Sequence, residues 1–98
     1  MSIRRNRVGV CDVVLVAGAG TGLWRDPDTV DGTAPVQIQL DKVPTFRWTQ
    51  RIVADGTATD NGEITLSAVT ASGFTLASAQ SGDTGTIRVF GICDQEDL

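Results

Sequence analysis

The chain has 98 residues, 41% of them hydrophobic, and a formal net charge of −4 at pH 7. This length fits one domain with a modest core, and the acidic balance disfavours nucleic acid as a partner. The sequence contains no His, so it lacks the usual general base near neutral pH and the imidazole ligand of many metal sites.

The glycine-rich stretch at residues 17–32, AGAGTGLWRDPDTVDG, matches no phosphate-binding motif. Its glycines alternate at Gly18, Gly20 and Gly22, whereas a dinucleotide site needs GxGxxG ahead of a helix and a P-loop needs a GK[ST] ending. We interpret the stretch as a long connection between strands and predict no nucleotide or other cofactor.

Three acidic residues cluster in the same stretch. Asp26, Asp28 and Asp31 stand at spacings that resemble a calcium loop, but Val30 occupies a ligand position and no Glu closes the loop. Three acids without an apolar pocket are normally solvated surface. We therefore predict no metal site, no catalytic residue and no enzymatic activity.

The two cysteines, Cys11 and Cys93, are too few for a disulfide framework or a zinc site. They favour synthesis in a reducing cytoplasm, where two free, buried thiols are expected rather than a disulfide. The apolar run at residues 8–17 is about half the length of a membrane helix, so no membrane partner is expected.

Charged residues are concentrated at the two ends of the chain. Arg4, Arg5 and Arg7 make residues 1–7 a basic arm, and residues 94–98 form an acidic tail. Short charged ends are commonly just solvated, but three arginines also suit docking on an acidic partner. We predict a single domain at residues 8–93 between these ends, with the three arginines as candidate partner-binding residues.

Short strands dominate the predicted domain. Apolar and polar residues alternate with period 2, and turn residues separate the segments. The fold expected is therefore all-β: a small antiparallel β-sandwich or jelly-roll-like barrel of about six to eight short strands. The expected strands lie at residues 8–17, 35–40, 45–53, 64–68, 74–77 and 86–92.

The first of these strands is apolar on both faces. Four valines occupy even positions, and Val13 and Leu15 occupy odd ones. Because one small sandwich cannot cover both faces, we predict that Val13 and Leu15 form an interface between copies of the chain. Asp12 is placed near a rim or an intersubunit contact, since a covered carboxylate needs hydrogen bonds.

The aromatic residues offer two further clues. Trp24 lies in a glycine-rich connection, where it either caps the end of the sandwich or is buried in another chain, and it is a candidate partner-binding residue. In the strand at residues 45–53, Phe46 and Trp48 share one face, and Arg47 and Thr49 share the other.

Three segments carry a resemblance to a known group of proteins. Residues 43–45 (VPT), 73–75 (GFT) and 86–92 (TIRVFGI) resemble corresponding strands in small β-sandwich modules of bacteriophage virion proteins. Those modules occur in tail-fibre tips, head fibres and capsid decorations, and they are similar to H-type lectin domains. The resemblance implies neighbouring first and last strands, a homotrimer, and a place in the virion after assembly in the host cytoplasm.

The expected function is accordingly that of a phage structural protein. A capsid decoration (cement) protein, bound to the major capsid protein on the outer head surface, is the leading hypothesis. The alternative is a tail, neck or fibre component, including a carbohydrate- or receptor-binding module, which would contact other virion proteins.

Overall fold

Alternation of inward and outward residues produces six short strands in the described part of this chain. The computed structural model describes residues 7–27 and 36–93. One 3-10 turn, Ala58–Asp60, lies between the third and fourth strands. The strands are β1 (Val8–Val14), β2 (Ala19–Leu23), β3 (Phe46–Val53), β4 (Ile64–Ser67), β5 (Gly73–Ser78) and β6 (Thr86–Ile92).

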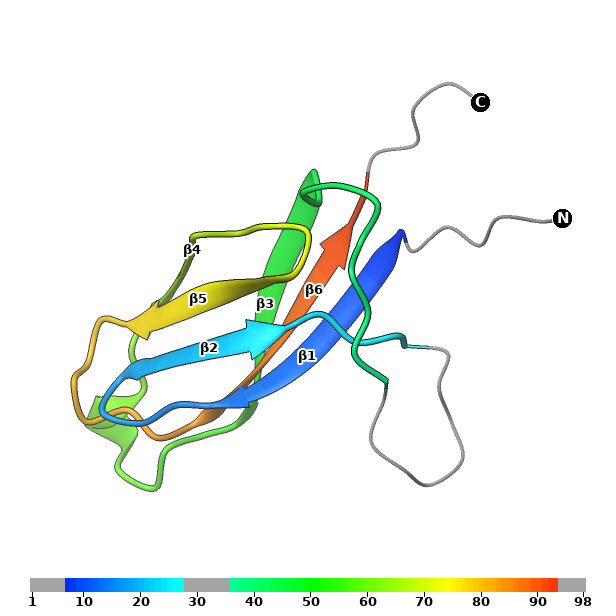
Figure 1. Cartoon of the computed structure of the whole chain (residues 1–98). Coiled ribbons are helices and arrows are strands. Elements are labelled where there is room, and N and C mark those ends of the chain that lie inside the picture. Colours follow the sequence, from blue (N-terminus) through cyan, green and yellow to red (C-terminus); the bar gives the residue numbers. More distant parts are fainter. Residues whose placement is uncertain (1–6, 28–35, 94–98) are drawn as a thin grey trace, which may run out of the picture.

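These strands form two antiparallel sheets that lie face to face (Figure 1). Sheet A has the order β1-β6-β3, and sheet B has the order β2-β5-β4. In sheet A, Val8 lies opposite Ile92 and Val14 lies opposite Thr86, so the first and last strands are neighbours. The predicted all-β sandwich is confirmed, and β3, β4, β5 and β6 lie within a residue or two of their expected positions.

The core between the sheets contains mainly aliphatic side chains. In β6, Ile87 and Val89 point inward and are fully buried. Removing such side chains from water is the dominant favourable term in folding. Both thiols are free and buried, as expected. The buried apolar residues are Cys11, Val13, Leu15, Trp24, Leu40, Phe74, Leu76, Ile87, Val89 and Cys93.

The prediction that Val13 and Leu15 lie at an interface is wrong. Val13 is 6% exposed and Leu15 is 1% exposed, because both point into the core of their own chain. A two-residue turn follows, in which Ala17 and Gly18 have φ of 52° and 76°, the positive values of a type I′ hairpin. This turn carries the chain directly into sheet B and covers the odd-numbered side of β1.

The long connection predicted at residues 17–32 is also wrong in part, because it contains β2. The two inward positions of β2 are Gly20 and Gly22, where an added Cβ would overlap Val13 and the Phe74 ring respectively. At Gly20 the obstacle belongs to sheet A, and at Gly22 it is the ring of the paired residue in the neighbouring strand of sheet B, so both sites require glycine. A strand whose inward residues are glycines shows no hydrophobic alternation, which explains why its sequence resembles a loop.

Trp24 lies in the core rather than at a partner surface. Its side chain is fully buried, its Nε1 donates to the Thr70 carbonyl oxygen at 2.9 Å, and its ring centroid lies 4.8 Å from that of Phe74. The indole rests on the paired glycines Gly9 and Gly91, where a Cβ would approach it to 3.0 and 2.8 Å. Of the two alternatives, a cap on the end of the sandwich or burial in another chain, the first is nearer the structure, in which the indole lies in the core of its own chain.

The strand predicted at residues 35–40 is absent from the described part of that segment, residues 36–40. Ile38 N–H donates to the Trp24 carbonyl oxygen, whereas Leu40 N–H donates to that of Ala71. Because these bonds reach two irregular segments, no continuous ladder forms. Leu40 is nevertheless buried, as the sequence predicts.

A buried carboxylate ties the far ends of the two sheets together. Asp83 accepts two bonds from the Arg51 guanidinium, at 2.9 and 2.7 Å, and one from the Ser78 hydroxyl at 2.6 Å. The backbone N–H groups of Gly62 and Gly85 donate to the same carboxylate. These donors, led by Arg51, hold the pKa of Asp83 well below its usual value despite burial.

Candidate functional site

The surface of sheet A that faces away from sheet B carries a contiguous group of exposed apolar side chains. The strand pairing places the side chains of β1, β6 and β3 in rows across this surface. We term it the outer face. Its four rows are Val8–Ile92–Phe46, Val10–Phe90–Trp48, Asp12–Arg88–Gln50 and Val14–Thr86–Val53.

Two adjacent rows of the outer face are entirely apolar. Phe46 is 57% exposed, Trp48 is 47% exposed and Val8 is 42% exposed, although all three are large hydrophobic residues. Single exposed hydrophobic residues are normal in soluble proteins, whereas contiguous apolar patches mark sites of association. The outer face is such a patch and is our candidate functional site.

The aromatic side chains on this face are held in a fixed arrangement. The rings of Trp48 and Phe90 stack across neighbouring strands, with centroids 4.8 Å apart and planes at 14°. Because one face of the indole is covered by Phe90, the pair projects ring edges as well as a flat surface. A rigid aromatic pair loses little side-chain entropy on binding, which suits it to anchor a protein partner.

The third row introduces one ion pair beside the two apolar rows. Arg88 Nε and Nη2 donate to the two carboxylate oxygens of Asp12, at 2.7 and 3.0 Å. The Asp12 carboxylate raises the pKa of Arg88, so the guanidinium stays protonated over the ordinary pH range. Asp12 lies on the exposed face of an edge strand, and the outer face carries no net charge from this row.

A hollow of about 440 Å³ adjoins the outer face at the β1 edge. Val10 and Phe90 form its apolar wall, and Arg25, Pro27 and Arg88 contribute to the rest of the lining. The outer face therefore combines projecting aromatic side chains on β3 with a hollow beside β1.

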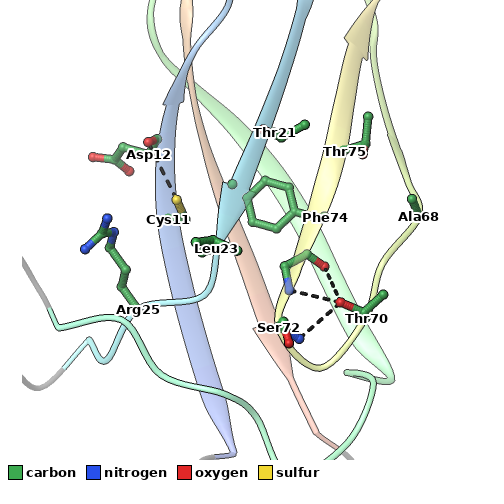
Figure 2. Close-up of a pocket in the computed structure, with 12 residues that line it drawn as sticks. Cys11, Asp12, Thr21, Leu23, Arg25, Ala68, Thr70, Ser72, Phe74 and Thr75 are labelled. Atoms are coloured by element: carbon green, nitrogen blue, oxygen red, sulfur yellow. Dashed lines mark hydrogen bonds between the residues drawn. The ribbon is translucent and has the colours of Figure 1, made fainter.

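On the other side of β1, a more open groove of about 580 Å³ lies between β1, β2 and the turn into β5 (Figure 2). Thr21 and Thr75 line it on one side, and Ser72 and Thr70 lie near its lower end. The Thr70 hydroxyl oxygen accepts bonds from the backbone N–H groups of Ser72 and Gly73, both at 3.1 Å. That hydroxyl is used mainly to shape the turn.

The chemistry available in this groove is limited. Burial raises the pKa of the Cys11 thiol, which keeps it protonated and weakly nucleophilic. Asp12 is already engaged by Arg88. Phe74, the groove's aromatic residue, is 4% exposed, so it offers no open ring on which a sugar could stack. The groove is thus a weaker candidate than the outer face.

The arginines predicted to bind a partner are only partly within the described chain. Arg4 and Arg5 lie outside the described residues, as do Asp28 and Asp31. Arg7 is half-buried, and its carbonyl oxygen accepts a 2.7 Å bond from Cys93 N–H. The backbone of Arg7 therefore extends the pairing of β1 with β6 and does not belong to a free arm.

The sequence contained a signal for the outer face that the prediction did not use. Phe46 and Trp48 were correctly placed on one face of their strand, and the four even-numbered valines on one face of β1. The prediction took the wrong side of β1 as the surface available to a partner. Val14 and Val16, at even positions, are 63% and 73% exposed.

Among residues 7–27 and 36–93, no group of three or more acidic or cysteine side chains lies close enough together to hold a metal ion. None of these residues belongs to a helix with the length and hydropathy needed to span a bilayer. No protein-family model matches the chain, and neither a curated protein nor a solved structure is significantly similar to it.

Proposed function

We propose that this chain is a non-enzymatic structural protein of a bacteriophage particle, and specifically a decoration protein bound to the outer surface of the capsid. One observation carries the assembly role: the outer face exposes two complete apolar rows, with Phe46 and Trp48 about half exposed. An exposed apolar surface of this kind lowers the solubility of a protein that does not associate, and it is typical of an interaction site.

The assignment to a phage particle rests on the strand motifs at residues 43–45, 73–75 and 86–92. Residues 73–75 begin β5, and residues 86–92 coincide with β6, the central strand of sheet A. Residues 43–45 lead directly into β3. One of the three segments that carry the resemblance, residues 86–92, forms the central strand of the outer face, and residues 43–45 precede its edge strand β3.

Copy number in purified particles tests the proposal. A decoration protein is expected in numbers comparable with the major capsid protein, because it repeats over the capsid lattice. A small number of copies, set by the tail axis, would instead indicate a neck, tail or fibre component. Absence of the chain from purified particles would contradict a structural role in the virion.

The basic arm supplies a second test. Deleting residues 2–6, which include Arg4 and Arg5, should leave folding unchanged because Arg7, whose carbonyl oxygen bonds Cys93 N–H, is retained. Binding to particles should weaken markedly, and more so at raised salt, since arginines bind carboxylates through charge-assisted bonds. Equal co-sedimentation of the truncated and full chains with particles would place the capsid contact elsewhere.

A further inference from the structure

We propose that a second copy of this chain covers the outer face, so that Phe46 and Trp48 of one copy pack on Val8 and Val10 of the next. The inference rests on the proposed function, in which the outer face binds a protein, and it identifies that protein as the chain itself. Three properties of the surface support it: side-chain size, charge and area.

Side-chain sizes at the two edges of sheet A are complementary. β3 and β1 are the edge strands of the sheet, on either side of β6 (Figure 1). β3 presents the bulky Phe46 and Trp48, whereas β1 presents Val8 and Val10 in the same two rows. The hollow beside Val10 leaves additional space at the β1 edge.

A symmetry axis parallel to the strands brings these unequal edges together. Such an axis keeps each row at the same height in every copy, so β3 of one copy meets β1 of the next within the same row. Trp48 then faces Val10 and Phe46 faces Val8. A two-fold axis makes this contact reciprocal, and a three-fold axis makes it cyclic, as in the trimer that the resemblance implies.

The charge on the outer face also fits a second copy. The chain as a whole carries −4, but the outer face contains one acid and one base, Asp12 and Arg88, which neutralise each other. Two outer faces therefore meet without net electrostatic repulsion. The polar row of one copy, Asp12–Arg88–Gln50, contacts the same polar row of the other copy. The outer face offers no net charge to complement that of a strongly charged partner.

The area of the outer face is adequate for association. Its exposed apolar parts amount to roughly 500 Å², near the upper end of the largest patch on a typical monomer. A standard interface buries about 800 Å² per partner. The polar row and the rim at the hollow bring the total near that value, so an oligomer at micromolar concentration is expected.

Sedimentation equilibrium of the full chain, with and without Trp48→Asp, tests the contact. The wild-type chain is expected to be a dimer or trimer, and Trp48→Asp should weaken association by roughly 30-fold or more, as a central aromatic anchor does. Thr75→Asp, on the outward face of sheet B, is the matched control and should leave association unchanged. Circular dichroism confirms that each variant is folded.

Engineered cysteines test the predicted neighbours directly. Val10 and Trp48 flank β6, so within one chain their Cα atoms are about 10 Å apart, too far for a disulfide. The same spacing separates Val14 and Val53, which flank Thr86 of β6 in the fourth row, and a Val14→Cys, Val53→Cys double variant keeps Trp48 in place. This variant should therefore form disulfides between chains under mild oxidation. Thr21→Cys with Ser67→Cys, which flank β5 on the outward face of sheet B, is the control pair and should not cross-link.

The outcomes separate this inference from the proposed function. A monomeric wild-type chain overturns the inference, as does an oligomer that resists Trp48→Asp and yields no cross-link between positions 14 and 53. If the chain is a monomer but Trp48→Asp abolishes particle binding, the outer face binds another virion protein, and the proposed function stands. If the chain oligomerises as described but is absent from particles, the proposed function fails and the inference stands.

Discussion

At the scale of single residues, paired glycines determine where the largest core side chain fits. Gly9 and Gly91 lie opposite each other on the inward side of sheet A, and the Trp24 indole occupies the space that two Cβ atoms would fill. Seen in the sequence alone, each glycine interrupts a strand and Trp24 stands in a loop. Their relation depends on contacts across strands, which a linear pattern does not contain.

Substitution of Gly91 tests whether the packing of the Trp24 indole requires glycine at this position. A Cβ at position 91 would lie 2.8 Å from Trp24 Cη2 and 3.0 Å from Pro44 Cγ. Gly91→Ala should therefore destabilise the fold by about 1–3 kcal/mol through overpacking. Gly56→Ala is the matched control, because nothing lies within 4 Å of its added Cβ. Equal urea midpoints for the two variants would show that the indole does not depend on the glycine.

The buried Asp83 provides a second prediction, on pH dependence. Its pKa is lowered in the folded state, so its contribution to stability is fully present above the unfolded value of 3.8 and is lost as pH falls below it. Asp83→Asn should destabilise the protein by about 3 kcal/mol at pH 7 and flatten this acid slope. Asp12→Asn, in the exposed pair with Arg88, should cost about 1 kcal/mol or less.

Urea unfolding between pH 7 and pH 3 measures both quantities. Asp55, whose pKa is lowered mainly by the Thr84 hydroxyl, adds acid sensitivity of the same sign to every variant. An Asp83→Asn variant that retains the full acid slope of the wild-type chain would assign that slope to other carboxylates.

At the scale of elements, the sequence predicts strands well where one face is aliphatic and poorly where it is not. β5 and β6 alternate in the ordinary way and were placed correctly. β2 was missed because its inward residues are glycines. For β3, the sequence correctly predicts that the aromatic residues lie on one face and the polar residues on the other. It does not predict which of the two faces sheet B covers. Arg51 points inward, where its guanidinium donates to the Asp83 carboxylate. The aromatic side chains of β3 therefore lie on the outer face.

The turn between β1 and β2 carries a strain that substitution can relieve. Ala17 has φ of 52°, a conformation that costs an L-residue roughly 1–2 kcal/mol and that Asn tolerates better. Ala17→Asn introduces the Asn-Gly pair that type I′ turns prefer, and it should stabilise the protein by about 0.5–1 kcal/mol. Ala54→Asn, at an exposed position without positive φ, is the control for thermal unfolding measurements.

At the scale of the whole molecule, the two sides of the sandwich differ in chemistry. Apart from Leu23 at the end of β2, sheet B turns small hydroxyl and alanine side chains to solvent, whereas sheet A turns aromatic and aliphatic ones outward. The sequence correctly indicates that β1 is apolar on both faces, and it predicts that one surface of the sandwich binds a partner. It cannot specify which surface, because the turn after Val16 decides which side of β1 is covered by the chain itself.

Hydroxyl-radical footprinting of the two tryptophans tests the central claim, that the outer face is covered by protein when the chain assembles. Trp24 is fully buried within its own chain and serves as the internal control, and Trp48 is 47% exposed in the single chain. In dilute monomer, Trp48 should oxidise much faster than Trp24. In the assembled protein or particle, the Trp48 rate should fall toward that of Trp24. A Trp48 rate unchanged by assembly would show that the outer face stays in contact with solvent and would contradict the account.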